Sequence, residues 1–380
     1  MAGPSQLCQD VQRRLLLPNG HAHHRPWMAE VPWVARARGA PRPRVFDAFM
    51  FAGELELLET RLNVLSSVVD VFVIVEADVA HSGRYRRDLV FPAVKERFRS
   101  FLPRIRYRGV RASETPPKHG CARAPRGVSA KGAMECEHFL RGSLLREVLD
   151  AGARPTDILV SSDADEIPKP AYLRALRDCH VFGPSSNLTT HPSVFIMLAS
   201  MLMYNIGCHT GQNRWSYGPK VGAVFQFDLL RDQPWRFSSG MNYRRWGNTA
   251  ESGPRWADSA WHLTNFMTPE ALSRKLAGFF HFRDFGRADR LPGRLAGLMA
   301  RCKSPYPSKY RRMRRARPEL GSPTDDALAY IEAHFPALRA QPEVAWTNAA
   351  GERVFAVALA DTDASWSVNE TLVSSGRIHS

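Results

Sequence analysis

Residues 157–168 read Asp157-Ile-Leu-Val-Ser-Ser-Asp163-Ala-Asp165-Glu166-Ile-Pro168, in which an apolar run is followed by three carboxylates in four positions. A short apolar run of this kind is typical of a buried strand. In sheets of parallel strands joined by helices, ligands bind just beyond the carboxyl ends of the strands. This stretch therefore predicts a buried strand at 158–162 and a ligand site where that strand ends.

Segments on both sides repeat the alternation of strand and helix. Apolar or β-branched runs predict strands at 45–51, 68–75 and 104–107. Apolar residues at helical spacing predict helices at 55–65, 94–102, 133–149 and 328–335, and 108–131 is expected to be a long loop. Strands that alternate with helices form right-handed crossover units. We therefore expect a Rossmann-like α/β fold, with a mostly parallel sheet and helices on both faces.

The composition permits a large core but leaves the kind of partner open. The chain has 380 residues, of which 44% are hydrophobic, and its formal net charge is +15. Much of the excess is Arg in residues 1–44, 104–131 and 311–317. A basic surface suits a nucleic acid, and it equally suits an anionic small molecule such as a sugar nucleotide.

The two ends of the chain carry weak signals. Residues 1–44 are rich in Arg, His and Pro, so we expect a disordered or leader-like basic arm that folding does not require. Residues 45–340 are expected to form the catalytic domain, and 341–380 an extension of uncertain structure. No apolar run approaches the roughly 18 residues that a membrane span needs.

Several motifs of other enzyme classes are missing from the sequence. It contains no Gly-x-Gly-x-x-Gly, Walker A, Gly-x-Ser-x-Gly or His-Glu-x-x-His pattern, which counts against dehydrogenases, P-loop ATPases, serine hydrolases and zincins. Six cysteines are present without a Cys-x-x-Cys pair. This spacing argues against a zinc finger, and the even number permits disulfides.

The acidic turn after the strand at 158–162 is the strongest candidate for chemistry. Asp163 and Asp165 can converge on one divalent cation in a turn, and carboxylate oxygens favour Mg²⁺ or Mn²⁺. Such an ion leaves positions open for a diphosphate and offsets its charge as it departs. The alternative is a solvated turn in which Glu166 caps the next helix, a reading that Pro168 and Pro170 support.

Four further residues have both a functional and a structural interpretation. Arg141 could contact a phosphate, but its spacing from Glu137 also fits an ion pair on one helix face. Trp215 and Lys220 could stack on a sugar and bind an anion, or belong to an ordinary hairpin. Glu76 ends the strand at 68–75 on the ligand side of the sheet, where it could instead cap a helix.

These segments together resemble glycosyltransferase family 17, the family of β-1,4-mannosyl-glycoprotein 4-β-N-acetylglucosaminyltransferases. The similarity extends from about Val45 to His281. The matching motifs, in chain order, are residues 46–62, Val69–Glu76, Glu137-x-x-x-Arg141, Asp157–Pro168, Tyr204-Asn205, Trp215-x-x-Gly218-x-Lys220, Trp261-His262, Pro269-Glu270 and His281. Leu140, Gly142 and Ala260 depart from the family's usual residues, which are Gln, Asn and Gly.

The resemblance implies a GT-A type fold, UDP-N-acetylglucosamine as the donor, Mn²⁺ or Mg²⁺ as the cofactor, and inversion at the anomeric carbon. It makes His262 the expected third metal ligand, because GT-A enzymes often supply one from the second half of the chain. The predicted site has three sets of residues: Asp163, Asp165 and Glu166 as catalytic; Glu76, Arg141, Trp215 and Lys220 as donor-binding; and Asp163, Asp165 and His262 as metal ligands.

The predicted function is therefore transfer of N-acetylglucosamine from a UDP-sugar to a glycan or glycoprotein, in β-1,4 linkage to a mannose of an N-glycan. The resemblance also implies the Golgi and membrane association, although the sequence shows no anchor. A nucleic-acid partner is not expected. Three alternatives stay open at this point, namely a metal-dependent nucleotide-diphosphate hydrolase, a basic protein that binds nucleic acid without catalysis, and an inactive relative.

Overall fold

The computed structural model describes most of the expected domain and parts of both ends. The described residues are 4–16, 33–37, 39–81, 89–115, 130–180, 194–211, 215, 218–224, 227, 255–278, 285, 291–306, 313–315, 322, 326–335, 338, 345–347 and 353–355. His281, the last residue of the matching motifs, lies outside them. None of the described helices combines the length and the apolar character that crossing a membrane requires.

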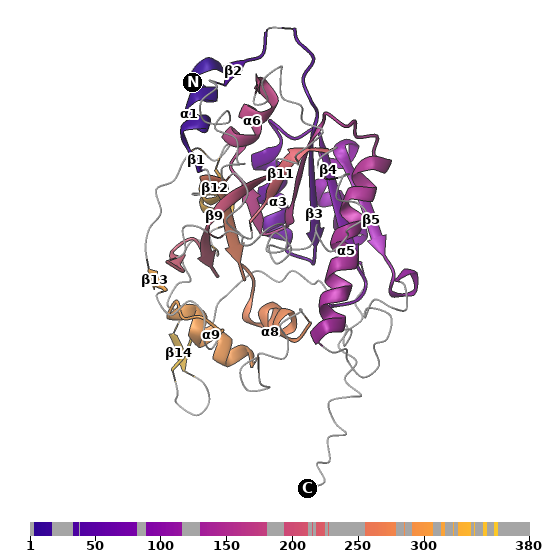
Figure 1. Cartoon of the computed structure of the whole chain (residues 1–380). Helices are drawn as coiled ribbons and strands as arrows, with labels where there is room; N and C mark the ends of the chain where they lie inside the picture. The colour runs from indigo at the N-terminus through magenta and orange to yellow at the C-terminus, as the bar shows by residue number, and fades with distance from the viewer. Residues whose placement is uncertain are drawn as a thin grey trace.

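Strands and helices alternate through the first half of the chain (Figure 1). The helices are α1 (Pro4–Arg13), α3 (Leu55–Leu65), α4 (Val90–Val94), α5 (Ala130–Asp150), α6 (Pro170–Asp178), α8 (Pro269–Gly278), α9 (Pro292–Ala300) and α10 (Ala327–His334), with 3-10 turns η1 (Lys95–Phe98), η2 (Leu102–Arg104) and η3 (Ala112–Glu114). The main strands are β3 (Val45–Phe51), β4 (Val71–Ala77), β5 (Ile105–Val110), β6 (Ile158–Asp163), β9 (Phe195–Met203), β11 (Lys220–Ala223) and β12 (Arg255–Thr264).

Short strands extend this framework at its edges. They are β1 (Leu15–Leu16), β2 (Val34–Ala35), β7 (Glu166–Pro168), β8 (Cys179–His180), β10 (Cys208–His209), β13 (Arg314–Arg315), β14 (Ala345–Thr347) and β15 (Arg353–Phe355). The last two pair only with each other. Most of 341–380, the extension of uncertain structure, lies outside the described residues.

The central sheet is mostly parallel, as the sequence predicted. Its strand order in the described chain is β1-β12-β9-β11-β6-β3-β4-β5. Within this order β11 is antiparallel to β6 and β9, and β1 is antiparallel to β12, while the other six strands share one direction. The carboxyl ends of those six strands therefore meet at one edge of the sheet.

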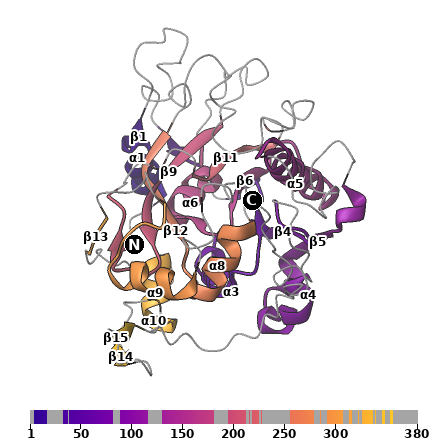
Figure 2. The same cartoon turned by 90° about the horizontal axis from the view of Figure 1, so that it is seen from below.

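Helices cover both faces of the sheet, because β3 is apolar on both sides. Val45, Phe49 and Phe51 belong to one buried cluster, together with leucines of α3 and α6. Phe46 and Ala48 belong to a second cluster, with leucines of α5. Figure 2 shows α5 and α3 on opposite sides of the sheet. These observations confirm the α/β fold class.

Some boundaries differ from the prediction. The helix expected at 94–102 is a short α4 followed by two 3-10 turns. Pro103 accounts for the break near 102, because proline lacks the amide hydrogen and restricts the residue before it. Part of the loop expected at 108–131 belongs instead to β5, and another part to the first residues of α5.

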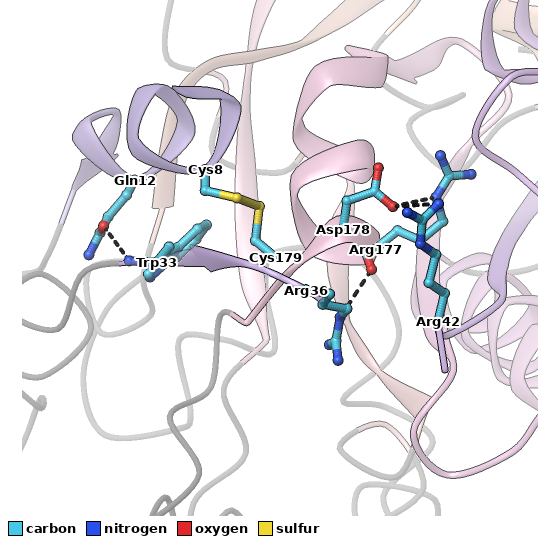
Figure 3. The surroundings of a disulfide bond; sticks show 8 residues. All are labelled: Cys8, Gln12, Trp33, Arg36, Arg42, Arg177, Asp178 and Cys179. Carbon is cyan, nitrogen blue, oxygen red and sulfur yellow. Dashed lines mark hydrogen bonds and ion pairs between the residues drawn. A yellow bond between two sulfur atoms is a disulfide. The ribbon is translucent and has the colours of Figure 1, made fainter. Parts of the chain in front are cut away.

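The described part of residues 1–44 is folded, which corrects the expectation of a disordered arm. Helix α1 is tied to the chain after α6 by a disulfide between Cys8 and Cys179, and both cysteines are fully buried (Figure 3). The backbone amide of Trp33 donates to Gln12 Oε1 at 2.9 Å. The ring of Trp33 packs edge-on against Trp256 of β12, with 5.9 Å between centroids.

Composition could not reveal this packing, because the partners of the arm lie far away in the sequence. The disulfide spans 171 residues. β1 adds to the outer edge of the sheet, where Leu15 lies opposite Trp256 of β12. The described residues of the arm therefore pack against the rest of the folded domain.

We predict that removing residues 1–42 destabilises the protein. A variant that begins at Pro43 loses the disulfide and the packing on Trp256, and its free energy of unfolding should fall by about 2–5 kcal/mol. Denaturant unfolding followed by tryptophan fluorescence measures this. Full-length Cys179→Ser loses only the disulfide, so its free energy of unfolding should lie between those of the wild type and the shortened chain. An unchanged midpoint for the shortened chain would mean that the arm contributes nothing.

Candidate functional site

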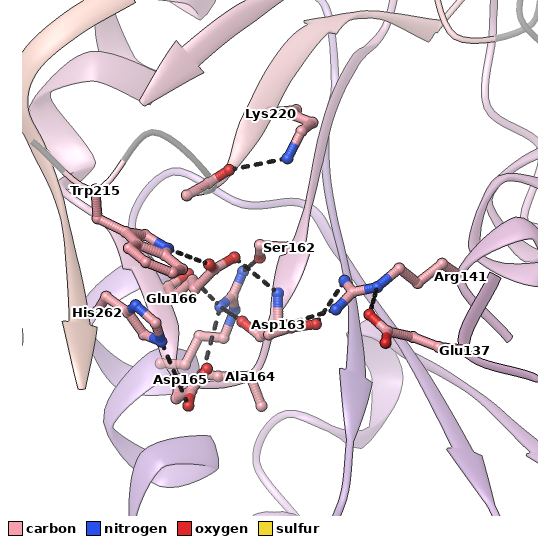
Figure 4. A network of polar contacts seen from close by, with 12 residues as sticks. Glu137, Arg141, Ser162, Asp163, Ala164, Asp165, Glu166, Trp215, Lys220 and His262 are labelled. Carbon is pink, nitrogen blue, oxygen red and sulfur yellow. Dashed lines mark hydrogen bonds and ion pairs between the residues drawn. The ribbon is translucent and has the colours of Figure 1, made fainter. Parts of the chain in front are cut away.

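The acidic turn lies at the carboxyl edge of the sheet, as expected. β6 ends at Asp163, and β7 begins three residues later at Glu166. β7 pairs antiparallel with β12, which places His262 opposite Glu166. The amide of Leu263 donates to the carbonyl oxygen of Asp165 at 2.8 Å. These strand pairings bring His262 beside the turn, although it is distant in the sequence (Figure 4).

A fully buried arginine from α3 fixes the backbone of this turn. Arg61 forms a fork with Asp47 of β3, in which Nε lies 2.7 Å from Oδ2 and Nη2 lies 2.6 Å from Oδ1. Its Nη1 donates to the carbonyl oxygens of Asp163 at 3.0 Å and Glu166 at 2.8 Å. Nη2 also donates to Ser162 Oγ at 2.7 Å.

The sequence interpretation missed Arg61, and one signal could have revealed it. On α3 the residue shares a face with Leu58, Leu62 and Leu65, all of them buried. A charged residue among buried leucines needs a partner of opposite charge. Asp47 is a charged residue in an otherwise apolar strand, so it could have been identified as that partner.

Arg141 on α5 binds the first carboxylate of the turn. Its Nη2 donates to Asp163 Oδ2 at 2.8 Å, and Nη1 lies 2.6 Å from Oδ1. Its Nε donates to Glu137 at 2.9 Å, so the expected helix pair is present, although only 13% of the Arg141 side chain is exposed. Burial alone would raise the pKa of Asp163, but Arg141 holds that pKa below its ordinary value.

Glu166 is buried, and Trp215 and Lys220 lie beside it at the turn. Trp215 Nε1 donates to Glu166 Oε1 at 3.2 Å, and the amide of Asp163 donates to Oε2 at 3.2 Å. Burial, together with the charge of Asp163, raises the pKa of Glu166 to about 8. Glu166 lies in β7 and caps no helix, so the structural alternative for this residue is wrong.

Lys220 contributes a buried cation behind Glu166. Its Nζ donates to the carbonyl oxygen of Gly218 at 3.3 Å. Burial lowers the pKa of Lys220, and the charge of Glu166 opposes that shift. Gly218 must lack a side chain, because a Cβ there would lie 2.5 Å from the carbonyl oxygen of Met197. The Gly218-Pro219-Lys220 segment can therefore pack closely against β9.

His262 has the properties of a metal ligand. Its Nε2 lies 3.8 Å from Asp165 Oδ2, and its buried Nδ1 has no hydrogen-bond partner among the described residues. Burial lowers the pKa of His262, which favours the neutral ring that binds metals. Trp215 covers the ring, with 5.1 Å between centroids.

The three predicted metal ligands are only partly gathered. Asp165 and His262 face each other, whereas the carboxylate of Asp163 points away from them toward Arg141 (Figure 4). Within the described ranges, no group of three or more His, Cys, Asp or Glu side chains is arranged to hold an ion. Asp165 and His262 therefore present two possible ligand atoms to a divalent ion, whereas the carboxylate of Asp163 is engaged by Arg141.

Glu76 has a structural role in place of the predicted contact with the donor. Its two carboxylate oxygens accept the amides of Val90 at 2.8 Å and Phe91 at 3.0 Å, at the start of α4. The hydroxyl of Tyr107 donates to the same carboxylate at 3.0 Å. The carboxylate therefore caps α4, which was the alternative interpretation.

Comparison with known proteins points to one family. Residues 29–197 match the family model described as Glycosyltransferase family 17. This segment includes the acidic turn and Arg141, and it ends before Trp215, Lys220 and His262. A search of curated proteins found no match. The first half of the site therefore has support from both the family and the geometry, and the second half from the geometry.

We predict that Arg61 stabilises the fold more than any exposed ion pair does. Arg61→Met leaves Asp47 buried without a counter-charge and should lower the free energy of unfolding by about 3–5 kcal/mol. The control is Arg97→Met, because Arg97 pairs with Glu59 at the surface and such pairs contribute about 0–1 kcal/mol. Urea unfolding compares the two. Equal losses would contradict the central role of Arg61.

Proposed function

We propose, from the match of residues 29–197 to the model of glycosyltransferase family 17, that the chain is a member of this family and transfers N-acetylglucosamine from UDP-N-acetylglucosamine to a glycan with inversion. The proposed acceptor is a mannose of an N-glycan, joined in β-1,4 linkage. One observation carries the proposal. The acidic turn, Arg141 and His262 meet at the carboxyl edge of a parallel sheet, where such sheets bind nucleotides.

Arg141 is suited to the donor diphosphate. Its guanidinium already binds two carboxylate oxygens of Asp163 in a fork. Carboxylates and phosphates present similar pairs of oxygens to such a fork. A diphosphate can therefore replace Asp163 as the partner of Arg141, while Glu137 keeps the guanidinium in place.

Exchange of that partner would complete the metal site. Once Arg141 binds phosphate, the carboxylate of Asp163 is free to join Asp165 and His262 around Mn²⁺ or Mg²⁺. A bound divalent ion supplies positive charge that offsets the charge developing on the departing diphosphate. Donor binding would then favour metal binding, because the diphosphate takes Arg141 away from Asp163. Metal binding would favour donor binding, because the ion takes Asp163 away from Arg141.

We further propose that Trp215 and Glu166 act on the sugars. The Trp215 ring is partly exposed and lies over His262, and an aromatic face of this kind stacks on apolar sugar faces. Glu166 can accept the proton of an acceptor hydroxyl only in its ionised form. With a pKa of about 8, Glu166 is mostly protonated at neutral pH, so transfer should increase as the pH rises through about 8.

The disulfides support a secretory compartment for this reaction. Cys8 pairs with Cys179, and Cys208 pairs with Cys302. Disulfides form and persist in oxidising compartments such as the endoplasmic reticulum and the spaces connected with it. The Golgi, where N-glycans are extended, is such a compartment.

We predict that Asp165→Asn abolishes transfer without unfolding the protein. The change removes one carboxylate from the proposed ion and should lower kcat at least about 100-fold, as loss of transition-state electrostatics does. Chelator should have the same effect on the wild type, and Mn²⁺ should restore transfer. The matched control is Asp150→Asn, an exposed position at the end of α5.

The assay should follow radiolabelled sugar into both glycan and water. Label in the glycan supports a transferase. Label released only as free sugar, with the same dependence on Asp165, would point to a hydrolase that uses the same turn. Full transfer in excess chelator would exclude the proposed role of the metal.

A further inference from the structure

A lysine from the second half of the chain reaches the acidic turn, and the sequence interpretation did not single it out. Lys275 lies on α8, which follows β12 at the edge of the sheet where β12 ends (Figure 1). Its Nζ is 3.7 Å from Asp165 Oδ2 and 3.9 Å from Glu54 Oε1. Glu54 lies three residues after the end of β3 and directly precedes α3, so Lys275 connects the segments that follow two parallel strands, β3 and β6.

The position of Lys275 overlaps with that of a metal at Asp165. The same oxygen, Oδ2, lies 3.8 Å from His262 Nε2 and 3.7 Å from the ammonium of Lys275. An ion held between Asp165 and His262 would therefore meet the positive charge of Lys275 at close range. Like charges at such a separation repel strongly in a partly buried site.

The Lys275 side chain can respond to that repulsion. It is 27% exposed, whereas the carboxylates of Asp165 and Glu54 are each 11% exposed. Lysine carries its charge on a flexible four-carbon stem, and it binds phosphates as a point charge without a fixed geometry. The ammonium can therefore leave Asp165 and still face the edge of the sheet.

We propose that Lys275 is a donor-binding residue that exchanges partners. In the structure its ammonium lies beside Asp165 and Glu54, and with the donor bound it would contact the diphosphate while the metal takes its place at Asp165. The diphosphate part of this inference rests on the proposed function. Together with Arg141, Lys275 gives the diphosphate two cationic side chains, one from each half of the chain.

The inference predicts opposite effects on two ligands. Lys275→Met removes a cation that competes for Asp165, so Mn²⁺ alone should bind about tenfold more tightly. UDP alone, in chelator, should bind about tenfold more weakly, because one charge-assisted contact to phosphate is lost. Electron paramagnetic resonance of free Mn²⁺ and calorimetry with UDP measure the two affinities.

Two further variants separate this role from a general change of charge. Lys95→Met removes the same charge from an exposed position on η1 and should alter neither affinity. Lys275→Arg keeps the charge and should keep at least part of the UDP affinity. Thermal unfolding of each variant verifies that α8 stays folded.

The results distinguish failure of this inference from failure of the proposed function. If wild type binds UDP and Lys275→Met binds both ligands with unchanged affinity, Lys275 only ties α8 to Glu54 and the inference is wrong. Tighter Mn²⁺ binding with unchanged UDP affinity would overturn the exchange onto the diphosphate. If wild type binds no UDP, with or without Mn²⁺, the donor site itself is wrong.

Discussion

The buried pair of Arg61 and Asp47 is the interaction on which the rest of the site depends. Both side chains are fully buried, and the guanidinium also binds the carbonyl oxygens of Asp163 and Glu166. An unpaired buried charge is far more costly than a paired one. The carbonyl oxygens at both ends of the turn therefore face inward to Arg61, and this fixed backbone holds the carboxylates at the edge of the sheet.

Cationic side chains allow so many carboxylates to lie together in one turn. Arg141 binds Asp163, Lys275 approaches Asp165, and the charge of Lys220 acts on Glu166. The sequence indicated that something positive had to neutralise the turn and assigned that part to a metal. In the structure these three side chains supply the neutralising charge together. A metal would therefore replace a cationic side chain at its carboxylate, and a diphosphate would replace a carboxylate as the partner of a cationic side chain.

The fold class and the first half of the sheet could be predicted because their signals are local, whereas β9, β11 and β12 were not predicted. β3 and α3 have the predicted bounds, since apolar runs and helical spacing depend on neighbouring residues. The acidic turn could be predicted in the same way, because it comes directly after the apolar run that forms β6. Arg61 escaped notice because an arginine in a helix ordinarily faces solvent, and only the burial of its leucine neighbours reveals otherwise.

The features that the sequence did not predict depend on interactions between residues that are distant in the sequence. The arm at residues 1–44 has the composition of a disordered segment, yet Cys8 reaches Cys179 across 171 residues. Lys275 and Glu54 meet only because α8 follows β12 back to the edge of the sheet. Glu76 lies near the carboxyl end of β4, where a donor-binding residue is expected, but its carboxylate accepts the amides at the start of α4. Spacing along the chain contains none of this information.

Binding of the donor at the acidic turn can be measured in solution. The most direct measurement is hydrogen–deuterium exchange of the full chain, with and without UDP-N-acetylglucosamine and Mn²⁺. Amides of residues 163–166 and 261–264 should exchange more slowly when both ligands are present, because a bound ligand stabilises the region that it contacts. Protection confined to other parts of the chain would contradict donor binding at the acidic turn.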